Sequence, residues 1–214
     1  SIPCPVPVST LNGHRLVTRY ENGRMYQTRL LTWIDGTPLA KIEHPTESLI
    51  TEIGRGLGQL SRSLSTFSHP GAQRNIVWDL SRPLQISEHT HAIQHPHQRR
   101  IANHLFLGLE TSGIGRIAQV RRSVIHNDAN DYNILVHSKN KLAGLIDFGD
   151  LTHSATIAEL AVAMAYIMLD TSNPLQAVHP LIRGFHEEYP LQSNEIEAPV
   201  YHQCRRTRYV QFLC

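Results

Sequence analysis

Two short polar motifs in the middle of the chain carry side chains that bind metal ions or move protons. The first has the form His-x-Asp-x-x-x-x-Asn, from His126 through Asp128 to Asn133, and the second is the Asp-Phe-Gly triplet that begins at Asp147. Each motif borders a short, β-branched apolar run, the pattern of a buried strand with a polar site at its end. Phosphoryl transfer from a nucleotide needs a carboxylate beside the acceptor hydroxyl and oxygen ligands for Mg²⁺. We therefore predict that Asp128 is the catalytic carboxylate and that Asn133 and Asp147 hold Mg²⁺.

A β-hairpin between the motifs would bring the two predicted metal ligands together. The apolar runs 134–136 and 142–146 are separated by the polar sequence Ser-Lys-Asn-Lys at 138–141. A polar turn between two β-prone runs is typical of a hairpin. Asn133 precedes the first strand and Asp147 follows the second, so both lie at the same end of the predicted hairpin and can share one ion.

Taken together, the two motifs resemble the aminoglycoside phosphotransferase-like branch of the protein-kinase-like fold. The sequences Ile-His-Asn-Asp-Ala-Asn-Asp-Tyr-Asn-Ile-Leu at 125–135 and Ile-Asp-Phe-Gly-Asp at 146–150 are similar in particular to its hydroxylysine-kinase group. Weaker similarities extend over most of the chain, at 29–36, 69–70, 78–80 and 159–161.

The resemblance implies a phosphotransferase that uses Mg²⁺ and takes its phosphate from ATP or GTP. The implied acceptor is a hydroxyl of a small molecule, an amino alcohol or hydroxy-amino acid similar to hydroxylysine rather than an aminoglycoside. The resemblance also implies that Trp33, Ile34 and Asp35 form a hinge whose backbone faces the nucleotide base.

The implied fold class is α+β, with a remnant of the kinase small lobe and the hinge at 1–35 and a mainly helical large lobe at 36–214. Asn22-Gly23, between two β-prone runs, predicts a hairpin in the first part. Apolar residues spaced three and four apart predict helices at 46–67, 98–109 and 174–189 in the second. The segment 156–169 is nearly all apolar around Glu159 and predicts a buried helix, and Ser193 is expected to cap a last helix.

The kinase-like fold also needs a glycine-rich loop and a strand lysine that holds the nucleotide phosphates. The lysines of the chain are Lys41, Lys139 and Lys141, and none precedes the predicted hinge. We therefore expect a fused or missing N-terminal segment, and we expect this truncated chain to be inactive alone.

Several other features receive a structural interpretation. The glycines of Gly-Arg-Gly-Leu-Gly at 54–58 lie inside a predicted helix, so we interpret them as a helix contact rather than a phosphate loop. The histidines at 89, 91, 95 and 97 lack the converging partners of a zinc site and are predicted to lie on the surface. Trp78 and Leu80 are expected to anchor an otherwise irregular segment.

Composition excludes some partners. The formal net charge of +2 is too small to indicate nucleic-acid binding, and we interpret the arginines at 205, 206 and 208 as a solvated face. No apolar run approaches the ~20 residues of a membrane-spanning helix, and the N-terminus lacks the pattern of a signal peptide. Cys4, Cys204 and Cys214 have no metal or redox spacing and are predicted to be free thiols. We expect a cytoplasmic protein that binds neither nucleic acid nor membrane.

Two alternatives to an active kinase remain open from the residues. Loss of the lysine favours a pseudokinase, a binding remnant that keeps the pocket without turnover. A metal-dependent hydrolase could instead use His126, Asp128 and Asp147 as ligands. Asp131 and Asp150 could each contact the metal shell, bind a cationic substrate amine, or be solvated.

Overall fold

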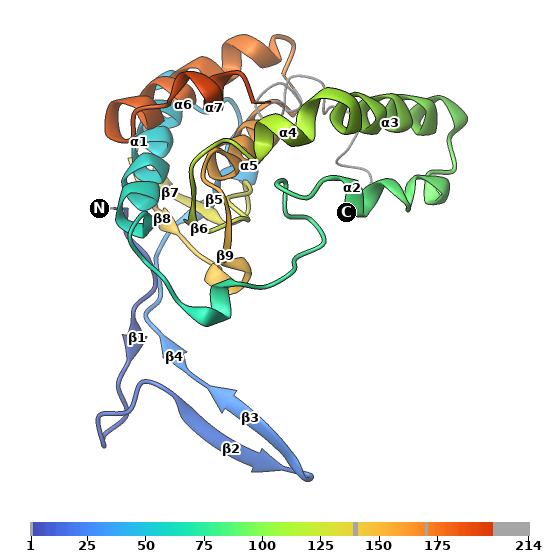
Figure 1. Ribbon diagram of the computed structural model, residues 1–214. Coiled ribbons are helices and arrows are strands. Elements are labelled where there is room, and N and C mark those ends of the chain that lie inside the picture. Colours follow the sequence, from blue (N-terminus) through green and yellow to red (C-terminus); the bar gives the residue numbers. More distant parts are fainter. Residues whose placement is uncertain (1, 139–140, 170, 199–214) are drawn as a thin grey trace.

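A narrow arm of paired strands extends from a body of helices and short strands, so the fold is α+β as predicted (Figure 1). The computed structural model describes residues 2–138, 141–169 and 171–198. In the arm, β1 (Pro7–Val8) pairs with β4 (Leu30–Leu31), and β2 (Val17–Glu21) pairs with β3 (Arg24–Thr28).

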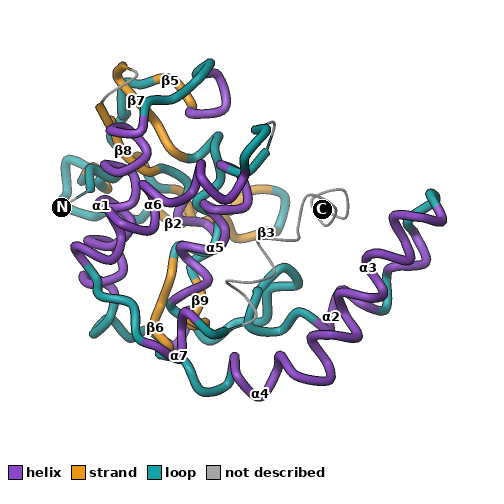
Figure 2. The backbone as a smooth tube through the Cα atoms, turned by 90° about the horizontal axis from the view of Figure 1, so that it is seen from above, coloured by secondary structure: helices purple, strands orange, loops and turns teal. Residues whose placement is uncertain are grey.

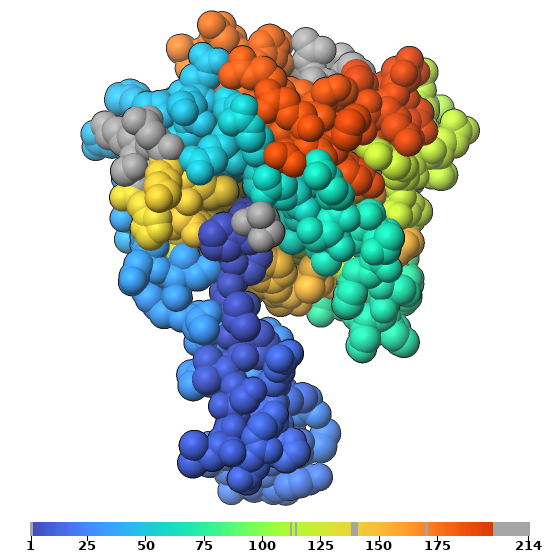
Figure 3. Space-filling model, turned by 90° about the vertical axis from the view of Figure 1, so that its left-hand side faces the viewer, coloured from blue at the N-terminus to red at the C-terminus, as the bar shows by residue number. Residues whose placement is uncertain are grey.

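The arm ends in the predicted hairpin. Asn22 and Gly23 form its turn with φ values of 50° and 73°, the left-handed backbone that Asn and Gly accept most readily. All residues of β2 and β3 are exposed, and in the space-filling view of Figure 3 the blue arm projects away from the body. The hairpin prediction is therefore confirmed, while the division of the chain at residue 35 stays a prediction.

Residues 2 and 3, which precede the arm in the chain, pack in the body and not in the arm. Ile2 is buried, and the main-chain oxygen of Pro3 accepts the N–H of Leu145 at 3.0 Å. A Cβ on Gly144 would lie 2.6 Å from that same oxygen, so glycine is what permits the approach.

Two small antiparallel sheets lie in the body. One has the order β5-β7-β8, formed by β5 (Thr37–Pro38), β7 (Ile134–Ser138) and β8 (Lys141–Leu145), and the other pairs β6 (Arg122–Ile125) with β9 (Thr152–Ala155). β7 and β8 are the predicted hairpin, with Ile134 opposite Leu145.

Helices make up most of the body. The long ones are α1 (Glu47–Leu64), α3 (Pro96–Gly108), α5 (Ile157–Ile167) and α6 (Pro174–Glu188), and the short ones are α2 (Leu84–Ser87), α4 (Ile114–Ile117) and α7 (Ser193–Ile196). Single turns of 3₁₀-helix span Leu39–Lys41, Pro70–Ala72, Thr90–Ala92 and Phe148–Asp150, and a π-helical turn spans Leu109–Gly113. No helix in the described ranges is long and apolar enough to cross a membrane.

Side chains cap the N-termini of two of the long helices, α1 and α6. The Thr46 side chain accepts the N–H of Leu49, and the Asn173 side chain accepts the N–H of Gln176, with Pro174 at the first helical position. Such caps satisfy backbone donors that the first turn of a helix leaves unpaired.

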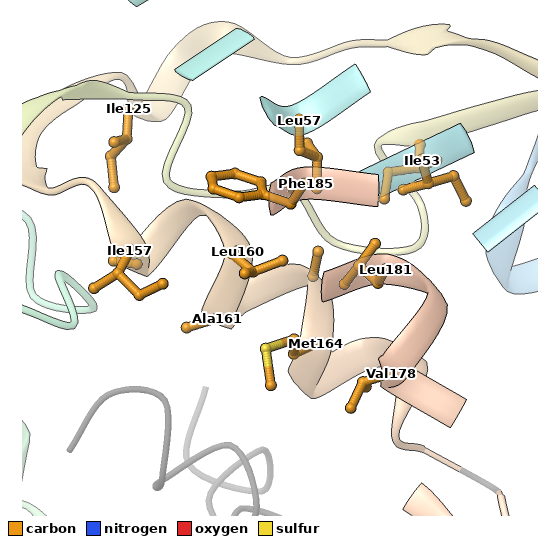
Figure 4. Close-up of a cluster of buried hydrophobic side chains, with 14 of the residues drawn as sticks. Ile53, Leu57, Ile125, Ile157, Leu160, Ala161, Met164, Val178, Leu181 and Phe185 are labelled. Carbon is orange, nitrogen blue, oxygen red and sulfur yellow. The ribbon is translucent and has the colours of Figure 1, made fainter. Parts of the chain in front are cut away.

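The core is built where α1, α5 and α6 meet. Figure 4 shows Leu57 of α1 and Leu160 of α5 beside Leu181 and Phe185 of α6, and each of these side chains is at most 1% exposed. Amphipathic spacing predicted α1 and α6, and the nearly all-apolar sequence of α5 predicted a buried helix.

Glycines let α1 and α6 touch along their backbones. A Cβ on Gly54 would lie 2.1 Å from the main-chain oxygen of Leu181, and a Cβ on Gly184 would lie 2.1 Å from that of Thr51. Both tube and ribbon views show the two helices side by side (Figures 1 and 2). The interpretation of these glycines as a helix contact is confirmed, and a phosphate loop there is excluded.

Several expected details differ. Phe67 lies beyond the end of α1 and is 48% exposed. Trp78 is 47% exposed and anchors nothing, whereas Leu80 packs against the core as expected. Gln192, rather than Ser193, caps α7, because its side chain forms a capping box with Glu195. The arginine cluster at 205–208 and the cysteines at 204 and 214 lie outside the described residues.

We expect Gly54→Ala to destabilise the chain, because its new Cβ would meet the Leu181 backbone. The free energy of unfolding should fall by about 1–3 kcal/mol or more, the usual effect of overpacking, as measured by urea-induced unfolding. Gly108→Ala is the matched control, since a Cβ there meets nothing within 4 Å and alanine favours a helix. Equal stability of Gly54→Ala and the unchanged chain would contradict a tight backbone contact.

Candidate active site

His126 is the first residue after β6, and it braces the loop that carries the predicted catalytic carboxylate. It is fully buried. Its Nε2–H donates to the main-chain oxygen of Ile146 at 2.9 Å, and its Nδ1 accepts the N–H of Asp128 at 3.2 Å. These partners define the neutral tautomer with the proton on Nε2. Neither ring nitrogen is free to bind a metal, so the metal-hydrolase alternative built on His126 is wrong.

The same ring links the two motifs. His126 meets the ring of Phe148 edge-on, with centroids 4.6 Å apart, a favourable aromatic geometry. Through this contact and the bond to Ile146, the first motif is packed directly on the second.

Glu159 of α5 holds the backbone of the loop. Its Oε2 accepts the N–H of His126 at 2.6 Å, while its Oε1 is buried without a hydrogen-bond partner among the described residues. Burial raises the pKa of Glu159, while the backbone N–H of His126 acts in the opposite direction. The sequence placed Glu159 in a buried helix but indicated no role for it.

Asn127 makes the turn that presents Asp128. Its φ is 70°, so the backbone is left-handed, a conformation that Asn accepts more readily than most other non-glycine residues. The side chain is buried, and within the described residues neither its amide nitrogen nor its oxygen has a hydrogen-bond partner.

Asp128 is half-buried and held by two amides. Asn130 Nδ2 donates to its Oδ1 at 2.8 Å, and Asn133 Nδ2 donates to its Oδ2 and to its main-chain oxygen, each at 2.9 Å. Burial raises the pKa of Asp128, the Asn130 hydrogen bond lowers it, and the nearby charge of Asp150 raises it again. Sequence reasoning missed Asn130, whose position inside the motif was the available signal.

The predicted metal ligands lie at the same end of the β7–β8 hairpin. The main-chain oxygen of Asn133 accepts the N–H of Ile146 at 3.0 Å, and Asp147 is the next residue. Asp147 has a left-handed φ of 62° and an exposed side chain whose Oδ1 accepts the N–H of Gly149.

These two residues fit Mg²⁺ by their donor atoms. Because Asn133 commits its amide nitrogen to Asp128, its Oδ1 is the atom left for a cation. A carboxylate and an amide oxygen, completed by phosphates and water, are typical of protein-bound Mg²⁺.

An arginine that the sequence did not single out also reaches this turn. Arg74 Nη2 donates to the main-chain oxygen of Gly149 at 2.5 Å and lies 3.3 Å from Asp150 Oδ1. Asp150 was left unassigned between three roles, and the structure pairs it with Arg74.

Asp79 explains how the irregular segment before α2 is held. It is 2% exposed and accepts hydrogen bonds from the N–H and Oγ of Ser81 and from Ser154 Oγ on β9. Asp79 is therefore the most deeply buried of these three residues, and its bond to Ser154 joins this segment to β9.

The predicted hinge lies where the arm joins the body. Trp33 is 87% exposed and Ile34 is half-buried. Just beyond them, Thr37 of β5 pairs with Val136 of β7, and the N–H of Ala40 donates to the main-chain oxygen of Asp131. Backbone pairing therefore joins the residues just after the predicted hinge to the first motif and the strand that follows it. The contact of the hinge with a nucleotide stays a prediction.

The predicted surface histidines are exposed, at positions 89, 91, 95 and 97. In the part of the chain that the structure describes, no three histidine, cysteine, aspartate or glutamate side chains converge as a metal site.

Comparison with known proteins places this geometry in a family. Residues 1–191, more than half of the chain, match the phosphotransferase enzyme family. The chain belongs to that family. Hydroxylysine kinase of Xenopus laevis is 29% identical to it, over 92% of this chain and 57% of the relative. The family member described here therefore spans little more than half the length of that relative.

Solved structures share the fold of this phosphotransferase family member. A microcompartment-associated aminopropanol kinase matches with a TM-score of 0.63 and 20% identity, over 96% of this chain and 65% of that one. Amicoumacin kinase hAmiN, in complex with AMP-PNP, Ca²⁺ and Ami, matches with a TM-score of 0.64 and 14% identity, over 95% of this chain and 62% of that one. The predicted protein-kinase-like fold is confirmed.

We expect Glu159→Gln to loosen the loop, because a neutral amide oxygen accepts the buried His126 N–H more weakly than a carboxylate oxygen does. The free energy of unfolding should fall by about 1 kcal/mol, the difference between a hydrogen bond to a charged acceptor and one to a neutral acceptor. Amide hydrogen exchange at His126 should be faster. Glu43→Gln, at an exposed position, is the control and should change neither quantity. Unchanged exchange in Glu159→Gln would show that the carboxylate does not hold this backbone.

Proposed function

We propose that the complete protein transfers the γ-phosphate of ATP or GTP to a hydroxyl of a small hydroxy-amino acid or amino alcohol similar to hydroxylysine. The observation that carries this proposal is the position of Asp128. Two amides hold its carboxylate, and Asn133, one of these two partners, lies beside Asp147 at the end of one hairpin. The proposed compartment is the cytoplasm, where both donor nucleotides are abundant.

Each site residue has a proposed role. Asp128 accepts a hydrogen bond from the acceptor hydroxyl, orients it toward the phosphate and takes its proton. Asn133 Oδ1 and the Asp147 carboxylate hold Mg²⁺, which supplies charge neutralisation to the phosphates. The backbone of Trp33, Ile34 and Asp35 faces the nucleotide base.

Named relatives support the choice of donor and acceptor. The hydroxylysine kinase and the aminopropanol kinase are both named for substrates that carry an amine beside a hydroxyl. The amicoumacin kinase was solved with an adenine nucleotide analogue and a divalent cation. The pseudokinase alternative is disfavoured because Asp128, Asn133 and Asp147 are all present and adjacent along the loop and hairpin.

The activity of the proposed kinase should be measured with the protein expressed from its complete gene. The chain covers 57% of the Xenopus relative, and no lysine precedes its predicted hinge. We propose that the phosphate-clamping loop and lysine are contributed by a further segment of that protein.

Substitutions of Asp128 and Asp147 should distinguish the proposed roles of the two carboxylates. Asp147→Asn removes charge from the proposed Mg²⁺ shell and should weaken both Mg-nucleotide binding and transfer. Asp128→Asn should leave Mg-nucleotide affinity nearly unchanged while lowering kcat by about 10²–10⁴. Calorimetry and steady-state kinetics measure the two effects, with the surface variant Glu110→Gln as the control. If Asp128→Asn abolished Mg-nucleotide binding, the assignment of this loop to acceptor activation would be wrong.

The pH dependence of kcat/KM should change when the polar groups around Asp128 are substituted. Because the ionised carboxylate is the active form and burial raises its pKa, kcat/KM should fall as the pH drops through a pKa above the ordinary aspartate range. Asn130→Ala removes a hydrogen bond that lowers this pKa, so the acidic limb should move to higher pH. Asp150→Asn removes a charge that raises it, so the limb should move to lower pH. Shifts in the same direction would contradict Asp128 as the titrating group.

A further inference from the structure

An ion pair beside the proposed catalytic carboxylate has no part in the roles assigned above. Arg74, from the loop after α1, lies 3.3 Å from Asp150, which follows the second motif. Asp150 follows Phe148, whose ring packs against His126 in the loop of Asp128, and its charge acts on Asp128. The pair therefore borders the place where the acceptor hydroxyl must lie.

Both members of the pair remain open to a ligand. Their side chains are 42% and 32% exposed. Within the described residues, the hydrogen bonds of Arg74 come from Nη2 alone, so its Nη1–H and Nε–H groups remain available. By contrast, Arg121 forms a closed pair with Glu195, whose side chain is 1% exposed, and lies over the ring of Tyr189.

The charges of this pair match those of an α-amino acid. Arginine presents several N–H donors in a plane and binds carboxylates through two parallel hydrogen bonds. A carboxylate such as that of Asp150 binds an ammonium group. An α-amino acid carries both groups on one carbon, so it can contact both side chains without leaving an uncompensated charge.

We propose that Arg74 and Asp150 form the subsite for the zwitterionic end of the acceptor, with Arg74 binding its α-carboxylate and Asp150 its α-ammonium group. This inference rests on the proposed function. It narrows the acceptor class from amino alcohols in general to hydroxy-amino acids, whose hydroxyl then reaches Asp128.

Two other roles of the pair make different predictions. If Arg74 only braced the turn through Gly149, its loss would affect every acceptor alike. If Asp150 instead completed the Mg²⁺ shell, its loss would weaken nucleotide binding, although a guanidinium already beside it competes with a metal ion.

The test uses three matched acceptors with the protein from its complete gene. These are hydroxylysine, its decarboxylated analogue diaminopentanol, and amino-hydroxyhexanoate, which keeps the carboxylate but lacks the α-amine. Arg74→Gln should raise KM about 10- to 100-fold for the two carboxylates, as expected for losing a charged hydrogen bond, and leave diaminopentanol unchanged. Asp150→Asn should raise KM for hydroxylysine and diaminopentanol and leave amino-hydroxyhexanoate unchanged.

Arg82→Gln is the matched control. Arg82 comes from the same segment, is 46% exposed and pairs with a different carboxylate, Asp79, at 3.9 Å, so no KM should change. Equal KM increases for all three acceptors in Arg74→Gln would overturn the subsite, as would weaker Mg-nucleotide binding in Asp150→Asn.

Failure of the proposed function would be visible separately. Calorimetry with hydroxylysine and a non-hydrolysable nucleotide measures acceptor binding without transfer. If the unchanged protein bound hydroxylysine but never phosphorylated it, and Arg74→Gln weakened that binding, the kinase proposal would fall and the subsite would stand. If the unchanged protein bound no hydroxylysine, the subsite would fall.

Discussion

The loop that carries Asp128 depends on how one buried backbone N–H group is satisfied. His126, between β6 and the left-handed turn at Asn127, is fully buried. Its N–H donates to Glu159 Oε2 of α5 at 2.6 Å. A buried donor without a partner would destabilise the loop by about 1–3 kcal/mol, so this carboxylate is what allows the loop to leave β6 at that angle and present Asp128.

The helical scaffold matters because it keeps Glu159 in place. α5 packs on α6 and on α1, and the glycine contact between α1 and α6 brings those two helices to backbone distance. On its other side, α1 reaches the hairpin, where Glu52 Oε2 accepts the N–H of Leu142 at 3.0 Å. One rigid group of helices therefore positions both the loop of Asp128 and the hairpin that ends at Asp147.

The proposed site gathers negative charge. Asp128, Asp147 and Asp150 lie on two short segments that pack together through His126 and Phe148, and Arg74 pairs with Asp150. A divalent cation at Asp147 would compensate a second of these charges. Asp128 would then be the carboxylate left to receive a proton, and its partial burial raises its pKa in keeping with that role.

The sequence by itself determined the long helices and the two hairpins, and it supplied the proposed site residues, because these signals are local. The periodicity of α1, the Asn22-Gly23 turn and the spacing of Asp128, Asn133 and Asp147 depend only on neighbours in the chain. Residues whose roles depend on partners far away in sequence escaped it. Arg74 lies 76 positions from Asp150, Glu159 lies 33 from His126, and Asp79 lies 75 from Ser154. Only the tertiary structure decided these contacts, because the partner of a buried charged side chain depends on which distant segments pack beside it.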